Sequence, residues 1–269
     1  MTRVQSNTVH PPGIPVIRTT YITDDLIRVL TGQDAVVCVL SPGGMVHQNS
    51  MVDAAEAAGV KRFIINDFGW GPDIRGLPEF DTIQMQRLAA WDYAMARATE
   101  NQRFTYTGIT TGNPIDWALK KFPLMGFDIT RAGAIIYDHG TERFTGTTLQ
   151  GIGQAVVGVL KHPDETANRF VKVRFIVTCQ KELLQAFQAS TDSEWTIQHS
   201  TTKALMDTGR GKLQAGDRGW ILDLVVAQLF DEGQARCVVA ASREESDADL
   251  LGVIEESPSD VVKKVLGFT

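Results

Sequence analysis

The sequence has 269 residues, of which 43% are hydrophobic and 22% are charged. This is ordinary globular composition, and it excludes wholesale disorder and collagen-like sequence. The net charge of −6 supplies no basic face for phosphate backbones, so we expect no nucleic-acid partner. No apolar run approaches the ~18 residues that span a bilayer, and the polar N-terminus does not look like a secretory signal. These features predict a cytoplasmic protein without a membrane partner.

The cysteine and histidine pattern argues against a disulfide framework and against a metal site. The three cysteines, Cys38, Cys179 and Cys237, are widely spaced and odd in number, which fits a reducing interior. Cys38 lies in a strongly apolar run, so a packed thiol is expected there rather than a nucleophile. The histidines show no spacing with acidic residues that suggests a metal site, and no Gly-x-Ser-x-Gly elbow of a serine hydrolase is present.

Strands alternate with helices through the first half of the chain, after a polar segment that ends near Gly13. The expected strands cover residues 15–18, 34–40, 62–67 and 104–109, and the expected helices cover 24–30, 48–58 and 82–99. Thr23 is expected to cap the first helix. This alternation is typical of βαβ units with a parallel sheet and right-handed crossovers.

The second half of the chain is less regular. It contains expected strands at 132–137 and 170–177, and expected helices at 149–160, at 179–187 with Thr178 as its cap, and at 261–266, with two more within 201–231. We therefore expect an α/β protein with two regions, 1–130 and 131–269, packed as one unit. The first would form the parallel sheet, and the second would be a smaller α+β region that binds substrate or acts as a lid.

Four local patterns carry a family resemblance over residues 2–183. They are Gly32 to Val37, Gln48 followed by Asp53 to Phe63, the Asn66-Asp67-Phe68-Gly69 turn, and Phe104 to Thr107 combined with Asp116-Trp117. Together they resemble the fungal branch of the isoflavone-reductase-like and NmrA-like proteins. These are atypical short-chain dehydrogenases, and the resemblance implies a Rossmann-like doubly wound parallel sheet that binds NADP(H).

The start of the chain departs from this family. Members begin with a strand, a glycine-rich turn and a helix that hold the cofactor pyrophosphate, whereas Thr2-Arg3 here resembles the end of the family's second strand. The fold is therefore expected to be N-terminally truncated, and the cofactor to be NADP(H) or absent. The missing central strand should leave strand 15–18 either paired with strand 34–40 or held by another chain.

A second departure concerns the family's acid/base lysine. The matching position is near Arg87, and no lysine occurs between Lys61 and Lys120. Arginine keeps its charge at neutral pH, so it would clamp a carboxylate or polarise a carbonyl instead of moving a proton. Arg87 shares a helix face with Gln84 and Trp91, although an exposed surface arginine is the alternative interpretation.

The remaining candidate site residues follow predicted strands, where ligands bind in open α/β sheets. Tyr137 and His139 join Arg87 as catalytic candidates, because a histidine titrates near neutrality; a solvated turn is the alternative. The cofactor candidates implied by the resemblance are Arg3, Ser41, Pro42, Gly43, Asn66 and Phe68. The substrate candidates are Trp70, Asn113 and Trp117, and a loop containing Phe122 could close over them.

Three functions stay open on this sequence. The first is an NAD(P)H-dependent reductase of small-molecule secondary metabolism, acting on an enone, an imine or an aryl ether. The second is a cofactor-independent isomerase or cyclase on a degenerate reductase scaffold. The third is a non-catalytic regulator of the NmrA-like kind. The expected partner is a small-molecule substrate, and the chain could form a homodimer.

Overall fold

The structure is a computed structural model that describes residues 1–268. Its internal contacts divide the chain into two compact units, each built from several stretches of sequence. Unit 1 comprises Met1–Asp67, Thr82–Gly108 and Pro163–Phe170, and unit 2 comprises Phe68–Asp81, Ile109–His162 and the chain from Val171 onward. This division differs from the expected single boundary at residue 130, because the chain passes from one unit to the other several times.

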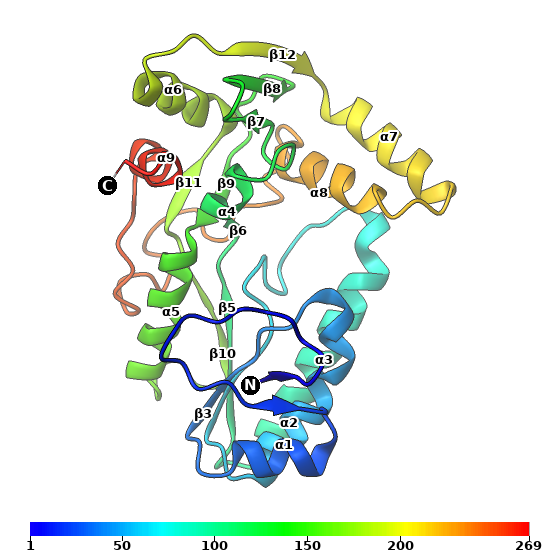
Figure 1. The fold of residues 1–269 in the computed structure, drawn as a ribbon, viewed down its shortest axis with the longest axis vertical. Coiled ribbons are helices and arrows are strands. Elements are labelled where there is room, and N and C mark those ends of the chain that lie inside the picture. Colours follow the sequence, from blue (N-terminus) through cyan, green and yellow to red (C-terminus); the bar gives the residue numbers. More distant parts are fainter. Residues whose placement is uncertain (269) are drawn as a thin grey trace. The chain divides into compact units, whose positions relative to one another are not determined.

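Unit 1 contains the parallel sheet that the alternating pattern predicted (Figure 1). Its strand order is β10-β5-β4-β3, and β3, β4 and β5 pair in parallel with Val36 opposite Phe63 and Phe63 opposite Tyr106. The strands are β3 (Ala35–Val37), β4 (Arg62–Ile64), β5 (Thr105–Thr110) and β10 (Arg169–Lys172); β5 and β10 continue into unit 2. The α/β fold class is confirmed.

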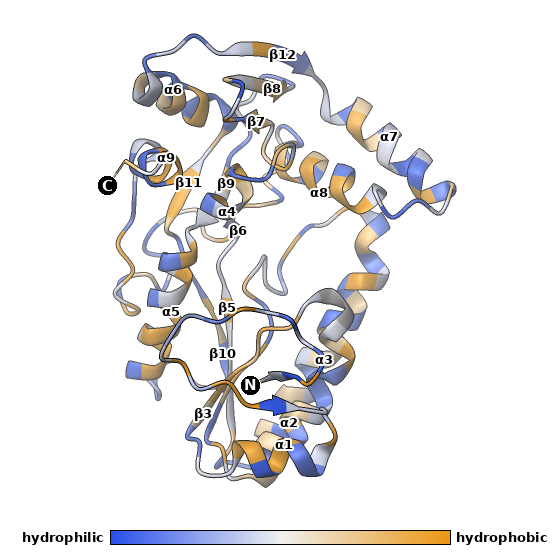
Figure 2. Cartoon of the chain, in the orientation of Figure 1, coloured by the Kyte–Doolittle hydropathy of each residue, from blue (hydrophilic) through white to orange (hydrophobic). Residues whose placement is uncertain are grey.

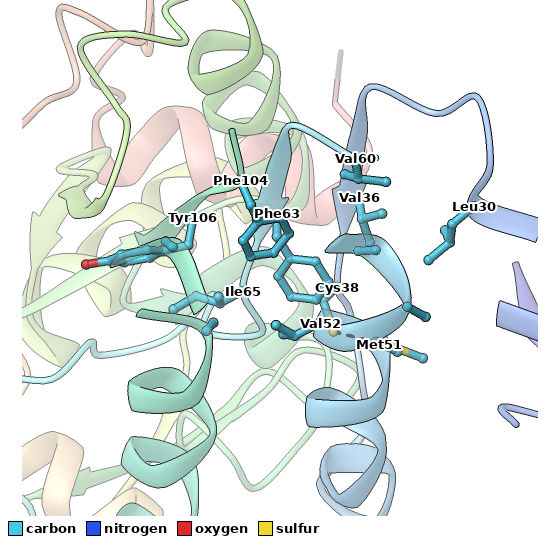
Figure 3. Close-up of a cluster of buried hydrophobic side chains, with 14 of the residues drawn as sticks. Leu30, Val36, Cys38, Met51, Val52, Val60, Phe63, Ile65, Phe104 and Tyr106 are labelled. Carbon is cyan, nitrogen blue, oxygen red and sulfur yellow. Dashed lines mark hydrogen bonds between the residues drawn. The ribbon is translucent and has the colours of Figure 1, made fainter. Parts of the chain in front are cut away.

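Three helices pack on this sheet and form the core of unit 1. They are α1 (Thr23–Leu30), α2 (Gln48–Ala57) and α3 (Asp81–Glu100). Figure 3 shows Cys38, directly after β3, beside Met51 of α2, with Val36, Val52 and Phe63 in the same buried cluster. Cys38 is buried beside the Met51 sulfur, and burial raises the pKa of its thiol to about 12. The expectation of a packed thiol is confirmed.

The N-terminal segment forms a small separate sheet. β1 (Thr2–Arg3) and β2 (Arg18–Thr19) pair in parallel, so the expected pairing of this segment with β3 is wrong. Thr23 does not cap α1, because Ile22 is the cap residue and makes no side-chain bond there. Asp25 in the first turn instead accepts hydrogen bonds from the Thr19 hydroxyl and from the backbone N–H of Thr20, and these bonds hold its pKa well below the ordinary value.

Residues 163–170 belong to unit 1 because their contacts are made with β4 and β5. The guanidinium of Arg62 is buried and donates to the hydroxyls of Thr107 and Thr166 at 2.8 and 3.0 Å. Asn168 accepts a hydrogen bond from the backbone N–H of Tyr106, and the Phe170 ring packs 5.1 Å from that of Trp91. A buried arginine without these acceptors would be costly, so they fix the segment beside the sheet.

Unit 2 contains two three-stranded sheets, in the orders β11-β9-β6 and β12-β8-β7. The expected strand 170–177 is two strands in different sheets, and the strands over 144–147 and 196–200 were not predicted. The strands are β6 (Asn113–Pro114), β7 (Phe127–Asp128), β8 (Gly133–Tyr137), β9 (Phe144–Thr147), β11 (Ile176–Thr178) and β12 (Thr196–Ser200).

Among the helices of unit 2, α7 and α8 follow each other in the chain and pack together. Figure 2 colours α8 as the more hydrophobic of the two. α7 passes through Gly209 without a break, and the turn between the two helices lies at 215–219. The helices are α4 (Ile115–Leu119), α5 (Leu149–Lys161), α6 (Gln180–Thr191), α7 (Thr202–Gln214), α8 (Trp220–Phe230) and α9 (Pro258–Leu266). Within residues 1–268, no helix combines the length and the apolar character that crossing a membrane requires.

Candidate functional site

Asn66 joins the carboxyl ends of two neighbouring strands in unit 1. Its Oδ1 accepts a hydrogen bond from the backbone N–H of Leu40 at 3.0 Å, and its Nδ2 donates to the Leu40 carbonyl at 3.1 Å. The two bonds of the Asn66 amide therefore hold the segment after β3 against the end of β4. The buried Asn66 side chain therefore positions the turn that begins at Ser41 and does not reach outward.

The turn itself begins as a 3₁₀ helix over Pro42–His47. The backbone N–H of Gly44 donates to the Ser41 carbonyl at 2.8 Å, and the Ser41 side chain is exposed. Pro42 and Gly43 are described by their backbone alone. The turn thus presents an exposed hydroxyl at the end of β3.

Asp67 and Arg87 form an ion pair directly after β4. Nη2 of Arg87 lies 3.1 Å from Oδ1 of Asp67, whose side chain is completely buried, while that of Arg87 is 25% exposed. The guanidinium also lies 5.2 Å from the ring of Trp91, within the range of a cation–π contact. Arg87 therefore lies at the strand ends, against its interpretation as an ordinary surface arginine, and it shares its helix face with Trp91 as predicted.

Two polar atoms near this end of the sheet have no hydrogen-bond partner among the described residues. They are Oε1 of Gln48, at the start of α2, and Nε2 of Gln84, one turn before Arg87 on α3. The other amide atom of Gln48 donates to the carbonyl of Ala90 at 3.0 Å. Shielded amide atoms are usually satisfied by water or by a ligand.

Arg3 is exposed at the end of β1, and its charge acts on Tyr21. Burial raises the pKa of the Tyr21 phenol, and the nearby Arg3 partly offsets that rise. The Tyr21 ring meets that of His47 edge-on at 5.2 Å. A cation and an aromatic ring therefore lie together at the N-terminal end of unit 1.

In unit 2, the turn after β4 is fixed to the end of β5 by its backbone. The N–H of Phe68 donates to the Ile109 carbonyl, and the Gly69 carbonyl accepts from the N–H groups of Thr111 and Gly112. Phe68 adopts a left-handed conformation with φ 48°. Gly112 has φ 71°, and a Cβ there would lie 2.3 Å from the Thr145 carbonyl oxygen, so only glycine fits. The half-buried Trp70 is held on this rigid turn.

Asn113 and Tyr137 are connected through a buried amide that was not among the predicted site residues. Gln180, fully buried at the start of α6, accepts from the backbone N–H of Tyr137 and donates to the Met125 carbonyl. Nδ2 of Asn113 donates to the Met125 sulfur at 3.5 Å, and its shielded Oδ1 has no partner among the described residues. Gln180 therefore holds Tyr137 directly, and it is linked to Asn113 through Met125, which both residues contact.

Tyr137 and His139 differ in their ability to give up a proton. The Tyr137 ring is buried and stacks on that of Phe230 at 5.8 Å, and this burial raises the pKa of its phenol. His139 is exposed, and its Nδ1 lies 2.6 Å from Oε2 of Glu232. The hydrogen bond to Glu232 and the charge of that carboxylate raise the pKa of His139. The sequence did not predict Glu232, because 93 residues separate the two partners.

Trp117 lies on α4 with 45% of its surface exposed. It is therefore not a core tryptophan, which was the alternative interpretation. Oδ1 of Asp116 accepts hydrogen bonds from the backbone N–H groups of Trp117 and Leu149, which ties the start of α4 to the start of α5. The tryptophan is held on a fixed helix end with its ring partly in solvent.

Comparison with known proteins gives the family. A model described as NAD(P)H-binding matches residues 3–163. The oxidoreductase poxI of Penicillium oxalicum is 60% identical over 266 residues, which cover 99% of this chain and 85% of that protein. Among solved structures, AtPrR2 with NADP⁺ and (+)pinoresinol has a TM-score of 0.72 at 18% identity, covering 94% of this chain and 81% of that one. An isoflavone reductase has a TM-score of 0.69 at 15% identity, covering 90% and 78%.

These findings agree with the parallel sheet and with the family resemblance of the sequence patterns described above. The solved structures establish the fold, and the family model and the fungal relative establish the family. The chain belongs to the NAD(P)H-binding family and is a reductase-like protein with the fold of the isoflavone-reductase-like enzymes.

Proposed function

We propose that the protein is an NADP(H)-dependent reductase of a small molecule, in which Arg87 stabilises negative charge that develops on the substrate. The observation that carries this proposal is the Asp67–Arg87 pair. Its carboxylate is buried and its guanidinium is partly exposed over Trp91. Asp67 holds the guanidinium of Arg87 in place near the strand ends, where the ligands of α/β sheets bind.

The residues of unit 1 fit an NADP(H) cofactor at several points. The exposed Arg3 supplies a cation suited to a 2′-phosphate. Ser41 and the backbone of the turn after β3 supply donors at a strand end. The amides of Gln48 and Gln84 have shielded atoms for which a polar ligand would supply partners. When bound, NADPH supplies a hydride.

Arg87 acts by its charge and not by its protons. An arginine does not release a proton at neutral pH, whereas its guanidinium has five N–H donors, of which the bond to Asp67 uses few. A preorganised donor of this kind lowers the barrier to reducing a carbonyl or an imine. His139 is the better candidate proton donor of the two in unit 2, because burial keeps the proton on Tyr137.

The substrate class follows from the exposed aromatic side chain of Trp117 and the held ring of Trp70. Flat rings favour a flat, largely apolar substrate, and the unpartnered Oδ1 of Asn113 would accept from a polar group on it. An enone, an imine or an aryl ether meets these requirements.

Cofactor binding is the first test. Titrating the protein with NADPH should quench tryptophan fluorescence with micromolar affinity, and NADH should bind more weakly. Arg3→Ala should remove most of this preference, about tenfold or more, because a charge-assisted hydrogen bond to a phosphate is worth roughly 1.5–3 kcal/mol. Arg103→Ala is the matched control, since Arg103 is exposed.

The outcomes separate the three functions. Absence of binding at millimolar NADPH would contradict the reductase and favour an isomerase or a cyclase. Tight binding without consumption of NADPH, across a panel of enones, imines and aryl ethers, would favour a regulator.

Substitutions of Arg87 test its role once a substrate is found. Arg87→Ala should lower kcat by about 10²–10³-fold, as for the loss of one oxyanion donor, while NADPH affinity changes little. Arg87→Lys should preserve or raise turnover if a proton donor is useful at this position. Unchanged turnover in Arg87→Ala would mean that the site lies elsewhere.

A further inference from the structure

The sheet of β7, β8 and β12 in unit 2 (Figure 1) carries a cavity on one of its faces. The cavity volume is about 310 Å³, which is in the range of sites for small organic ligands. Its lining comes from all three strands and from the segments before and after β7, and it includes Phe122, Asp128, Arg131, Ile135, Thr196 and Gln198. The substrate candidates Trp70, Asn113 and Trp117 do not occur among the described residues that line it.

The register of the strands explains why the lining side chains share a face. Asp128 of β7 and Thr196 of β12 both pair with Gly133 of β8, and Gln198 pairs with Ile135. Paired residues point to the same face of a sheet, and so do residues two apart along a strand. All five positions therefore lie on the face that carries the cavity, and the positions between them lie on the opposite face.

Gly133 leaves space for a ligand on this face. A Cβ at Gly133 would lie 3.9 Å from both the Asp128 Cβ and the Thr196 carbonyl oxygen, which is ordinary van der Waals contact. Its φ lies outside the left-handed region, so neither sterics nor backbone conformation requires glycine at this position. A larger side chain there would project into the cavity.

The polar groups of the lining differ in the hydrogen bonds that they can make. The Asp128 carboxylate only accepts and the Arg131 guanidinium only donates. The exposed Thr196 hydroxyl and Gln198 amide do both. A ligand that meets this mixed set needs several groups that each donate and accept, as alcohol hydroxyls do, whereas a single carbonyl or phenol would meet only part of it.

The charges of the lining balance each other. Oδ1 of Asp128 accepts from the backbone N–H of Arg131 at 3.2 Å, and Oδ2 lies 3.7 Å from Nη1 of the same arginine. An ionic ligand of either sign would be attracted by one member of this pair and repelled by the other. The pair therefore favours a neutral ligand over an acid or an amine.

We propose that this cavity binds a neutral cyclic polyol, such as a pyranose sugar, at a site separate from the substrate residues of the proposed reductase. The CH groups on one face of the sugar ring cover the 49% exposed Phe122 and the half-buried Ile135. The hydroxyls at the rim of the ring donate to Asp128 and exchange hydrogen bonds with Gln198. The proposal does not depend on reductase activity, because binding at this site is measured without NADPH.

NMR spectroscopy of the isotope-labelled protein tests the site directly. The probes are glucose, galactose and mannose at millimolar concentration, and at least one should cause saturable shifts of the amide signals of Gly133, Ile135 and Gln198. Glycerol, an acyclic polyol, is the control for nonspecific contact and should cause no saturable shift. The uronic acid and the amino sugar of the pyranose that binds should both bind more weakly than the neutral sugar.

Gly133→Val fills the cavity and should abolish these shifts. The fold should be retained with an equal or higher melting temperature, because a β-branched residue suits a strand better than glycine does. His199→Val is the matched control, since His199 is exposed on β12 at a position of the opposite sheet face. This control should bind as the native protein does, and a folded Gly133→Val variant that still binds would overturn the proposal.

Asp128→Asn tests the charge selection independently of any folding defect in the valine variant. It leaves Arg131 as the charged side chain among the described lining residues, so the uronic acid should now bind more tightly than the neutral sugar. An unchanged preference would overturn the proposal. So would the absence of saturable shifts with all the pyranoses, or a phenol such as para-hydroxyacetophenone that binds more tightly than every one of them.

Discussion

His139 shows how one distant contact changes the chemistry of an exposed residue. Its side chain is 83% exposed, and by itself such a histidine would titrate like a free imidazole. Glu232 accepts its hydrogen bond, and the same carboxylate accepts from the Thr141 hydroxyl at 2.5 Å. The pKa of Glu232 is lowered by these two bonds, from Thr141 first and His139 second. Both shifts favour the charged form of the pair.

The pH dependence of this pair can be stated with its sign. The stabilisation from His139 is fully present below the ordinary pKa of imidazole and is lost as the pH rises through its raised value. The part from Glu232 is present above the ordinary carboxyl pKa and is lost as the pH falls through its lowered value. Glu232→Gln should return the pKa of His139, measured by NMR titration, toward the ordinary value. An unchanged titration would show that the contact does not form in solution.

The role proposed for Arg87 depends on its guanidinium, which keeps its charge at neutral pH. The sequence placed it on a helix face with Trp91, and the structure adds the buried carboxylate of Asp67. Because the guanidinium of Arg87 keeps its charge at neutral pH, the reductase proposal assigns it electrostatic stabilisation and leaves proton transfer to another group.

At the scale of elements, Arg62 ties two strands to a segment that follows 100 residues later. It donates to hydroxyls of Thr105, Thr107 and Thr166, and to the carbonyl of Pro163. Burial lowers the pKa of its guanidinium, although an arginine stays charged at neutral pH. These bonds fix the edge of the sheet on which β10 lies.

Arg62→Met should lower the free energy of unfolding by about 3 kcal/mol, because it leaves several buried acceptors without a charged donor. Urea unfolding followed by circular dichroism measures this change. Arg103→Met, at an exposed position one residue before the buried Phe104, should change the same quantity by about 0.5 kcal/mol or less. Equal effects of the two substitutions would contradict the assigned role of Arg62.

At the scale of the molecule, the two compact units are interleaved along the chain. Unit 1 needs residues 163–170, which supply Thr166 to Arg62, Asn168 to Tyr106 and Phe170 to Trp91. A division of the chain at residue 130 removes this segment from the sheet. It also leaves the ring of Trp91 without its aromatic neighbour.

A fragment of residues 1–130 is therefore expected not to fold by itself. It should lack a cooperative urea transition, and its tryptophan fluorescence should resemble that of the unfolded chain. Residues 1–172 should show more ordered structure, because the missing segment is restored. A cooperative transition in the shorter fragment would mean that residues 163–170 are dispensable for unit 1.

The sequence by itself determined the local elements of the parallel sheet. Apolar runs that end in turn residues located β3, β4 and β5, and helical composition, with acidic first turns in α1 and α3, located the helices α1 to α3 within a few residues. These signals are local: they depend on burial and on the conformational freedom of neighbouring residues. The family patterns, also local, indicated the reductase-like fold and the helix face of Arg87.

Only the tertiary structure decided which distant side chains meet. The pairing of β2 with β1, the division of strand 170–177 into two sheets, and the partners Glu232 and Gln180 all depend on contacts across many residues. A hydrogen bond between residues 93 positions apart leaves no periodic trace in the sequence, because each partner is an ordinary polar residue in its own segment. Packing decides which distant segments meet, so the side-chain pairs of the candidate site are seen only in the folded structure. The strands and helices that carry those side chains can be predicted from the sequence.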